Sequence, residues 1–151
     1  PLSMLYGLCS VIVMLTVVYI LHKHPSKTLK QAIFSFLGMH LISFVGYGLF
    51  PLSESGQPTT FTDIMHIYVV TIPVVLLSIY ALVCFILFGH KNKTHTELKY
   101  VSAFFLWMMF LGAMLSNLVH PSIFGVFERF STYSAVLFTA YLGIYVKHKM
   151  I

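Results

Sequence analysis

The stretch "IYVVTIPVVLLSIYALVCFILF", residues 67–88, decides the fold of this chain, because it contains no Asp, Glu, Lys or Arg. The hydrocarbon core of a bilayer is about 30 Å thick, and a helix of about 20 apolar residues is long enough to cross it. The stretch therefore predicts a transmembrane helix.

Four other stretches have the same length and apolar character, and they cover residues 4–21, 32–50, 100–119 and 124–146. Of the 151 residues of the chain, 58% are hydrophobic and 9% are charged, whereas about 25% are charged in an average globular protein. We predict an all-α polytopic transmembrane helix bundle with five spans, forming a single domain over residues 1–151. The short connections leave no room for a soluble domain, so any functional site lies inside the bundle or at its rims.

The lysines are distributed unevenly among the connecting segments. They follow the first, third and fifth predicted spans, as Lys23, Lys27, Lys30, Lys91, Lys93, Lys99, Lys147 and Lys149. By the positive-inside rule, we expect these segments and the C-terminus to be cytoplasmic in a multi-pass protein of the cell membrane. Lysines beside spans set topology and contact anionic lipid headgroups, so the net charge of +5 does not indicate a nucleic-acid partner.

This orientation places Pro1 on the outer side, although the residues near it are uncharged. We therefore expect a further helix before residue 1, which would give six spans in the full protein. The segments after the second and fourth predicted spans lack lysine. The single arginine of the chain, Arg129, comes shortly after the fourth span. We expect both segments to face outside.

Polar side chains collect at this outer rim. Thr60 and Asp63 have the spacing of a capping box, with Asp63 in place of the usual Glu. His66 begins the third span, His120 ends the fourth, and Glu128 lies near the start of the fifth. We predict that Asp63, His66, His120 and Glu128 line a ligand-binding pocket with Arg129 at its edge.

Glu128 and Arg129 are adjacent, and neighbouring residues of a helix point about 100° apart. Glu128 heads a narrow stripe with Thr132, Ala135 and Thr139 that is predicted to face the bundle, so Arg129 must face outward. An outward-facing arginine can extend to a lipid phosphate and bind it through two hydrogen bonds. The alternative is that both charges mark the water interface, where they cost little.

The second span places His40, Ser43 and Tyr47 on one helical face. An ionisable residue near the middle of the bilayer is a functional candidate, so His40 and Tyr47 join the predicted ligand-binding residues. The alternative for His40 is a neutral imidazole that is hydrogen-bonded to Ser43 or to a neighbouring helix. Glycines of the same span allow close helix approach, at Gly38, Gly46 and Gly48.

Two other chemistries fit the outer residues. The two imidazoles and two carboxylates could hold a divalent metal, although Asp63 already has a capping role and no metalloprotease motif is present. His66 and His120 could ligate a b-type haem, although both are expected near the surface. We assign no metal and no cofactor. Motifs for a nucleophile elbow or a phosphate-binding loop are also lacking, so no catalytic residue is predicted. The remaining histidines are expected to be solvated among the lysines, at His22, His24, His90, His95 and His148.

The order of motifs resembles a family of bacterial membrane proteins known as domain of unknown function nine-nine-eight. The resemblance rests on "GYGLFPLSESG" and "TDIMHIYVV" around the second connection, and on "GVFERFSTYSAVLFTAYLGIY" in the last span. Members of the family have a "GLxERi" entry to the last helix, and Val126 and Phe130 depart from that pattern here. The resemblance implies six helices, with motif residues at Asp63, His66, Glu128 and Arg129, and it implies no reaction.

The sequence leaves three hypotheses for function. The first is a protein without enzyme activity that binds a lipid headgroup or small amphipathic ligand at the outer pocket, with membrane lipids as partners. The second is a metal or haem site with redox or hydrolytic chemistry. The third is an accessory subunit that binds a membrane-protein partner or a second copy of the chain through its glycine-bearing helix faces.

Overall fold

The computed structural model describes residues 2–51, 60–118 and 121–151. For parts of the last two helices, including Glu128 and Arg129, it describes the backbone alone. The elements in chain order are α1 (Leu2–Leu21), α2 (Lys27–Leu49), α3 (Phe61–Ile64), the π-helix η1 (Met65–Thr71), α4 (Ile72–Lys91), the 3₁₀-helix η2 (Lys93–His95), α5 (Thr96–Leu118) and α6 (Pro121–Lys149). All of these elements are helical, which confirms the all-α prediction.

Each predicted span coincides with a helix, and α3, η1 and α4 together form the third. Within the described residues, three helical segments are long and apolar enough to cross a membrane, namely Met4–Leu21, Lys27–Leu49 and Phe61–Lys91. The chain is therefore a membrane-embedded helix bundle. The fourth and fifth predicted spans lie on α5 and α6, and their crossing of the membrane stays a prediction.

Helices α2, α3 and α6 each begin at a residue or motif that favours a helix N-terminus. Ser26 precedes α2, and its side chain accepts a hydrogen bond from the backbone N–H of Leu29. Thr60 and Asp63 form a complete capping box at α3, as the sequence predicts. Pro121 occupies the first position of α6, where its missing N–H costs nothing.

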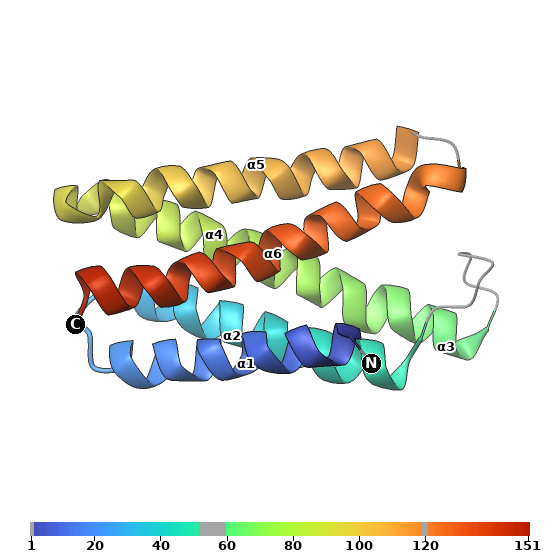
Figure 1. Ribbon diagram of the computed structural model, residues 1–151, viewed down its shortest axis with the longest axis horizontal. Helices are drawn as coiled ribbons and strands as arrows, with labels where there is room; N and C mark the ends of the chain where they lie inside the picture. Colours follow the sequence, from blue (N-terminus) through green and yellow to red (C-terminus); the bar gives the residue numbers. More distant parts are fainter. Residues whose placement is uncertain (1, 52–59, 119–120) are drawn as a thin grey trace.

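The long helices lie side by side along the long axis of the molecule (Figure 1). Helix α2 packs against α1 and α4, α5 packs against α4 and α6, and α6 returns to contact α1. Three aromatic side chains meet between these helices: the ring centroid of Phe36 lies 5.3 Å from that of Phe138 and 6.3 Å from that of Phe85. The edge-to-face geometry of these pairs is the favoured arrangement of aromatic rings.

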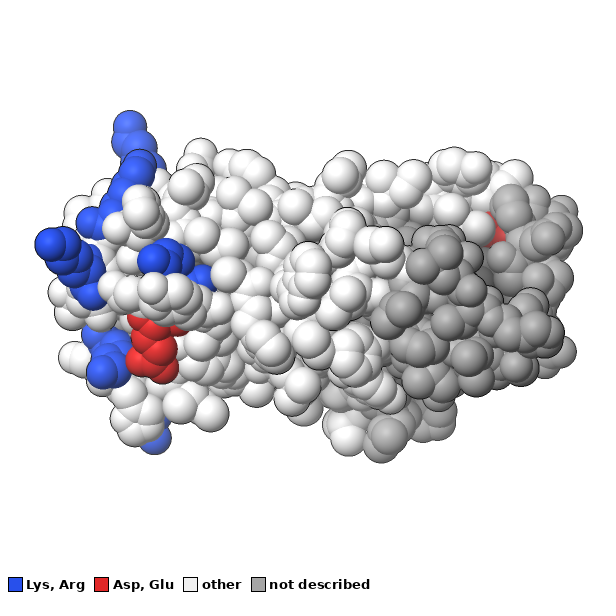
Figure 2. All heavy atoms as spheres, turned by 90° about the horizontal axis from the view of Figure 1, so that it is seen from above, with Lys and Arg blue, Asp and Glu red and all other residues white. Residues whose placement is uncertain are grey.

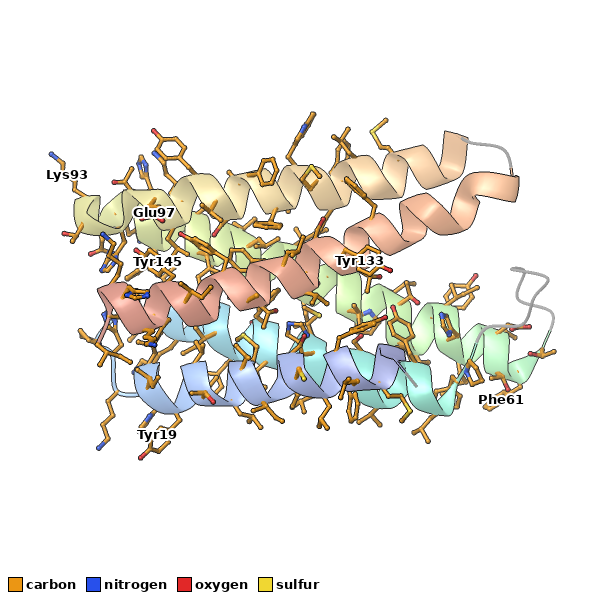
Figure 3. The ribbon with its side chains drawn as sticks, viewed as in Figure 1. Tyr19, Phe61, Lys93, Glu97, Tyr133 and Tyr145 are labelled. Atoms are coloured by element: carbon orange, nitrogen blue, oxygen red, sulfur yellow. The ribbon has the colours of Figure 1, made fainter. Side chains whose placement is uncertain are left out.

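The lysines gather at one end of the bundle, which we call the lysine end (Figure 2). Beside the lysines, Figure 2 shows a wide band of white atoms, which belong to described residues other than Lys, Arg, Asp and Glu. Lys93 and Phe61 are labelled at opposite ends of the molecule (Figure 3). We call the end that carries Phe61 the polar end. The separation follows the sequence prediction, and the cytoplasmic location of the lysine end stays a prediction.

The glycines of α2 differ in their surroundings. A Cβ at Gly46 would lie 2.6 Å from both Cγ atoms of Val70, so α2 and η1 approach closely there. A Cβ at Gly38 would meet only Leu77, at 3.8 Å, and one at Gly48 would have no neighbour within 4 Å. The prediction of close approach therefore holds at Gly46 and is wrong for Gly38 and Gly48.

Candidate functional site at the polar end

The π-helix η1 joins α3 to α4 at the polar end. Pro73 lacks the N–H that would continue a regular helix, and the turns before it are widened. The backbone N–H of Ile72 reaches the carbonyl of Ile67, five residues back, and the hydroxyl of Thr71 donates to the carbonyl of His66 over 2.9 Å. The structure accommodates Pro73 by a π-helix in the turns before it. Short π-helical segments are frequent at functional sites.

His66 lies within η1 and is half-buried. Its Nδ1 is 2.6 Å from the carbonyl oxygen of Phe50. A carbonyl only accepts hydrogen bonds, so Nδ1 carries the proton and Nε2 of the neutral ring carries the lone pair. Phe50 is the residue that ends α2, where carbonyl groups need partners from outside the helix. The ring of His66 therefore links α2 to η1.

Tyr47 supports the same link from α2. Its ring centroid is 4.8 Å from that of His66, and the two planes are inclined by 32°. The Tyr47 hydroxyl donates to Oγ1 of Thr71 over 3.4 Å, and Thr71 in turn donates to the His66 carbonyl. The position and the tautomer of the His66 ring are thus set by neighbours on two elements, as the orientation of a binding residue requires.

Asp63 is fully buried at the start of α3. Its carboxylate accepts hydrogen bonds from the backbone N–H of Thr60 over 3.0 Å and from the Thr60 hydroxyl over 2.8 Å. The backbone N–H of Asp63 donates to the Thr60 hydroxyl oxygen over 3.2 Å. A carboxylate at a helix N-terminus also interacts favourably with the helix dipole. Asp63 therefore has a structural role at the candidate site, next along the chain to η1.

His40 occupies a separate position in the interior of the bundle. It is 6% exposed, and its Nε2 lies 2.7 Å from Oγ1 of Thr139 on α6. The Thr139 hydroxyl donates its only proton to the carbonyl of Ala135, so Nε2 of His40 is the donor. The edge of the ring meets Phe36 at a centroid distance of 4.9 Å. His40 thus has the hydrogen bond to a neighbouring helix that was the alternative interpretation of this residue. The hydrogen bond of His40 goes to α6, whereas that of Tyr47 goes to Thr71 on η1.

The other predicted site residues lie outside the detailed description. His120 lies outside the described residues, as do the side chains of Glu128 and Arg129. The backbone of α6 places Glu128 and Arg129 about two turns after Pro121, toward the polar end (Figure 1). The predicted stripe on α6 is wrong at Thr132, which is exposed, while Thr139 is buried. Thr139 therefore faces α2, whereas Thr132 lies on the exposed side of α6.

A metal site among these residues is an alternative hypothesis that stays untested. Among the described side chains, no three from His, Cys, Asp and Glu lie close enough together to hold a metal ion. The ligands of that alternative include His120 and Glu128, to which this observation does not extend. The hydrogen bonds of Asp63 to Thr60 support the capping role that the sequence offered for this residue.

Sequence reasoning missed a polar cluster at the lysine end. Nδ1 of His95 lies 2.7 Å from the Tyr145 hydroxyl, and its ring stacks on Phe88 with centroids 5.2 Å apart. Glu97 and Tyr145 lie on α5 and α6 at this end of the bundle (Figure 3), and the Tyr141 hydroxyl donates to Glu97 over 3.2 Å. His95 was expected to be solvated, which is wrong. The spacing of Tyr141 and Tyr145, one helical turn apart, is the signal that could have indicated a partner.

Burial lowers the pKa of His95 from its usual 6.5, and the positive charges of His24 and Lys149 lower it further. His95 lies in η2, between the third and fourth predicted spans. The neutral imidazole is therefore favoured in the folded protein. This cluster ties η2 to α6 and closes the lysine end of the bundle.

The comparisons with known proteins give one match. A family model described as "Protein of unknown function (DUF998)" matches residues 3–145, which agrees with the resemblance seen in the motifs. No curated protein and no solved structure matches the chain.

Proposed function

The chain belongs to the DUF998 family of proteins of unknown function, and from the geometry at the polar end we propose that it binds a lipid headgroup or a small amphipathic ligand there. The observation that carries this proposal is the fixed orientation of His66. Its Nδ1 is engaged by Phe50 and its ring packs on Tyr47, so Nε2 is the nitrogen that can meet a ligand.

The second part of the proposed site is Arg129. A guanidinium group binds a phosphate through two parallel hydrogen bonds, and the long side chain can reach the headgroup region from within a helix. Arg129 is the only arginine of the chain, and the first turns of α6, to which it belongs, are at the same end of the bundle as α3 (Figure 1). In this proposal, Arg129 binds the phosphate while His66 and Glu128 contact other polar groups of the ligand.

The location of the site relative to the membrane is part of the proposal. If the lysine end faces the cytoplasm, as the positive-inside rule predicts, the polar end lies at the outer leaflet. A ligand with an apolar tail could then enter from the bilayer while its polar group meets His66. A site of this kind needs binding groups held at the membrane surface, and it does not require a catalytic residue.

The test is lipid retention measured by native mass spectrometry. The full chain is reconstituted in nanodiscs of an equal mixture of phosphatidylethanolamine and phosphatidylglycerol, then released in mild detergent. We expect Arg129→Gln to reduce the retained phosphatidylethanolamine by at least about tenfold, because a hydrogen bond to a charged group contributes about 1.5–3 kcal/mol. Lys93→Gln, an exposed lysine at the opposite end, is the matched control and should retain the lipid. Equal retention in the wild type and Arg129→Gln would refute the proposal.

A metal or haem site makes a different prediction for the same preparation. Elemental analysis and an absorption spectrum would then give a stoichiometric metal or a Soret band, and either signal would be lost in His66→Ala but kept in Arg129→Gln. That result would replace lipid binding by redox or hydrolytic chemistry at the polar end.

A further inference from the structure

A groove runs between α1 and α6 at the lysine end, far from the proposed headgroup site. Its volume is about 390 Å³. One wall consists of a single face of α1, with Ile12, Thr16 and Ile20 at successive turns, and the other wall includes Gly143 and Lys147 of α6. All of these residues are apolar except Thr16 and Lys147.

Two local features make the groove open and apolar. Gly143 has no side chain, and a Cβ at this position would lie 3.0 Å from Cγ1 of Val13, so α1 and α6 approach closely beneath the groove. The Thr16 hydroxyl donates to the carbonyl of Ile12 over 2.9 Å, so its proton is already used within α1. The groove therefore offers a hydrocarbon surface along most of its length.

The dimensions and the charge of the groove fit one class of ligand. The distance from Ile12 to Ile20 along a helix is about 12 Å, close to the hydrocarbon depth of one leaflet, which is about 15 Å as half of a bilayer core. Lys147 is exposed at the end of the groove, and its apolar stem can lie along the groove while its ammonium group stays at the headgroup level. The neighbouring lysines make this end strongly positive (Figure 2).

We propose that this groove holds an acyl chain of an anionic phospholipid from the leaflet at the lysine end, with the lipid phosphate on Lys147. A second copy of the chain fits less well, because two copies inserted in the same orientation would bring their lysine ends together. The inference does not rest on the proposed function, since the groove and its lysine lie at the opposite end of the bundle from His66 and Arg129.

The test uses lipid retention from nanodiscs of an equal mixture of phosphatidylglycerol and phosphatidylcholine, in an Arg129→Gln background that removes any lipid held by the polar end. We expect the protein to retain phosphatidylglycerol over phosphatidylcholine. Lys147→Gln should lower that preference about fivefold, the effect of one lysine near an anionic surface. Lys93→Gln, another exposed lysine at the same end, should leave the preference unchanged.

A second pair of variants tests the groove itself. Thr16→Phe fills the groove, whereas Leu15→Phe adds a ring to a neighbouring exposed position of α1 that does not line it. We expect Thr16→Phe alone to abolish the retained lipid while the helical circular dichroism of both variants stays unchanged. The proposal is overturned by equal retention of the two lipids, by equal effects of the two phenylalanines, or by a dimer that Thr16→Phe dissociates.

Discussion

In the interior of the bundle, Phe36, Phe85 and Phe138 pack edge to face between three helices; at the polar end, hydrogen bonds from His66 and Tyr47 join α2 to η1. Lipid tails are as apolar as the side chains between helices, so helix association in a bilayer depends on close packing and on hydrogen bonds. The interior and the polar end of this bundle rely on these two terms in different proportions. The difference indicates a packed support in the interior and oriented polar groups at the polar end.

The largest effect is expected from truncating the aromatic cluster. Phe36→Ala should lower the free energy of unfolding by about 3 kcal/mol, because it leaves a cavity among fully buried rings. Phe34→Ala, on the same helix but 51% exposed, should have little effect. Reversible unfolding in mixed micelles measures both values. Similar losses from the two variants would mean that this aromatic cluster does not hold the interior of the bundle together.

The next effect concerns the contact between α2 and η1. Gly46→Ala should destabilise the protein by about 2 kcal/mol through overpacking, because its methyl group would overlap Val70. Gly48→Ala adds the same methyl group in open space and should be neutral or slightly stabilising, since Ala favours a helix over Gly. The same unfolding assay checks the pair, and a loss of stability in Gly48→Ala alone would contradict the packing described here.

A smaller effect is expected at the start of α3. Thr60→Ala removes both the cap for the Asp63 N–H and a donor to the Asp63 carboxylate, and it should cost about 1 kcal/mol. Thr60→Ser keeps the hydroxyl and should restore most of the stability. An alanine variant as stable as the serine variant would show that the capping box does not hold the polar end together.

The smallest effect is the pH dependence contributed by His95. Its pKa in the folded protein lies below the usual 6.5, so the unfolded chain binds more protons between the two values and stability rises with pH there. The contribution is complete above about pH 6.5 and is lost as the pH falls toward the folded pKa. Thermal unfolding of His95→Gln should therefore depend less on pH than that of the wild type. A pH dependence in His95→Gln equal to that of the wild type would contradict this assignment.

The long apolar stretches made the helices predictable, because hydrophobic length alone specifies a transmembrane helix. The cap at Thr60 and Asp63 was predictable for a similar reason, since both partners lie within one turn. The π-helix was not predictable. Pro73 indicates a disturbed helix, but it does not indicate which backbone carbonyls accept hydrogen bonds from other donors. Those donors include the Thr71 hydroxyl, whose position depends on the packing of α2 against η1.

Contacts between distant residues mark the limit of the sequence analysis. His40 was recognised as a buried polar group, but its partner Thr139 lies 99 positions away. His95 was placed among solvated histidines because its neighbours in sequence are charged, whereas its partner Tyr145 comes from the last helix. In both cases the pairing follows from the way α6 returns across the bundle, which local patterns do not specify. The pocket residues His120, Glu128 and Arg129 stay predictions.

The most direct test of the account compares two histidines in matched environments at opposite ends. His66 and His95 each use Nδ1 in a hydrogen bond and each pack on an aromatic ring. Native mass spectrometry of His66→Gln and His95→Gln, after reconstitution in the phosphatidylethanolamine and phosphatidylglycerol mixture, measures the phosphatidylethanolamine retained by each. We expect His66→Gln alone to lose this lipid from the polar end while both variants stay folded. Undiminished retention by His66→Gln would contradict it.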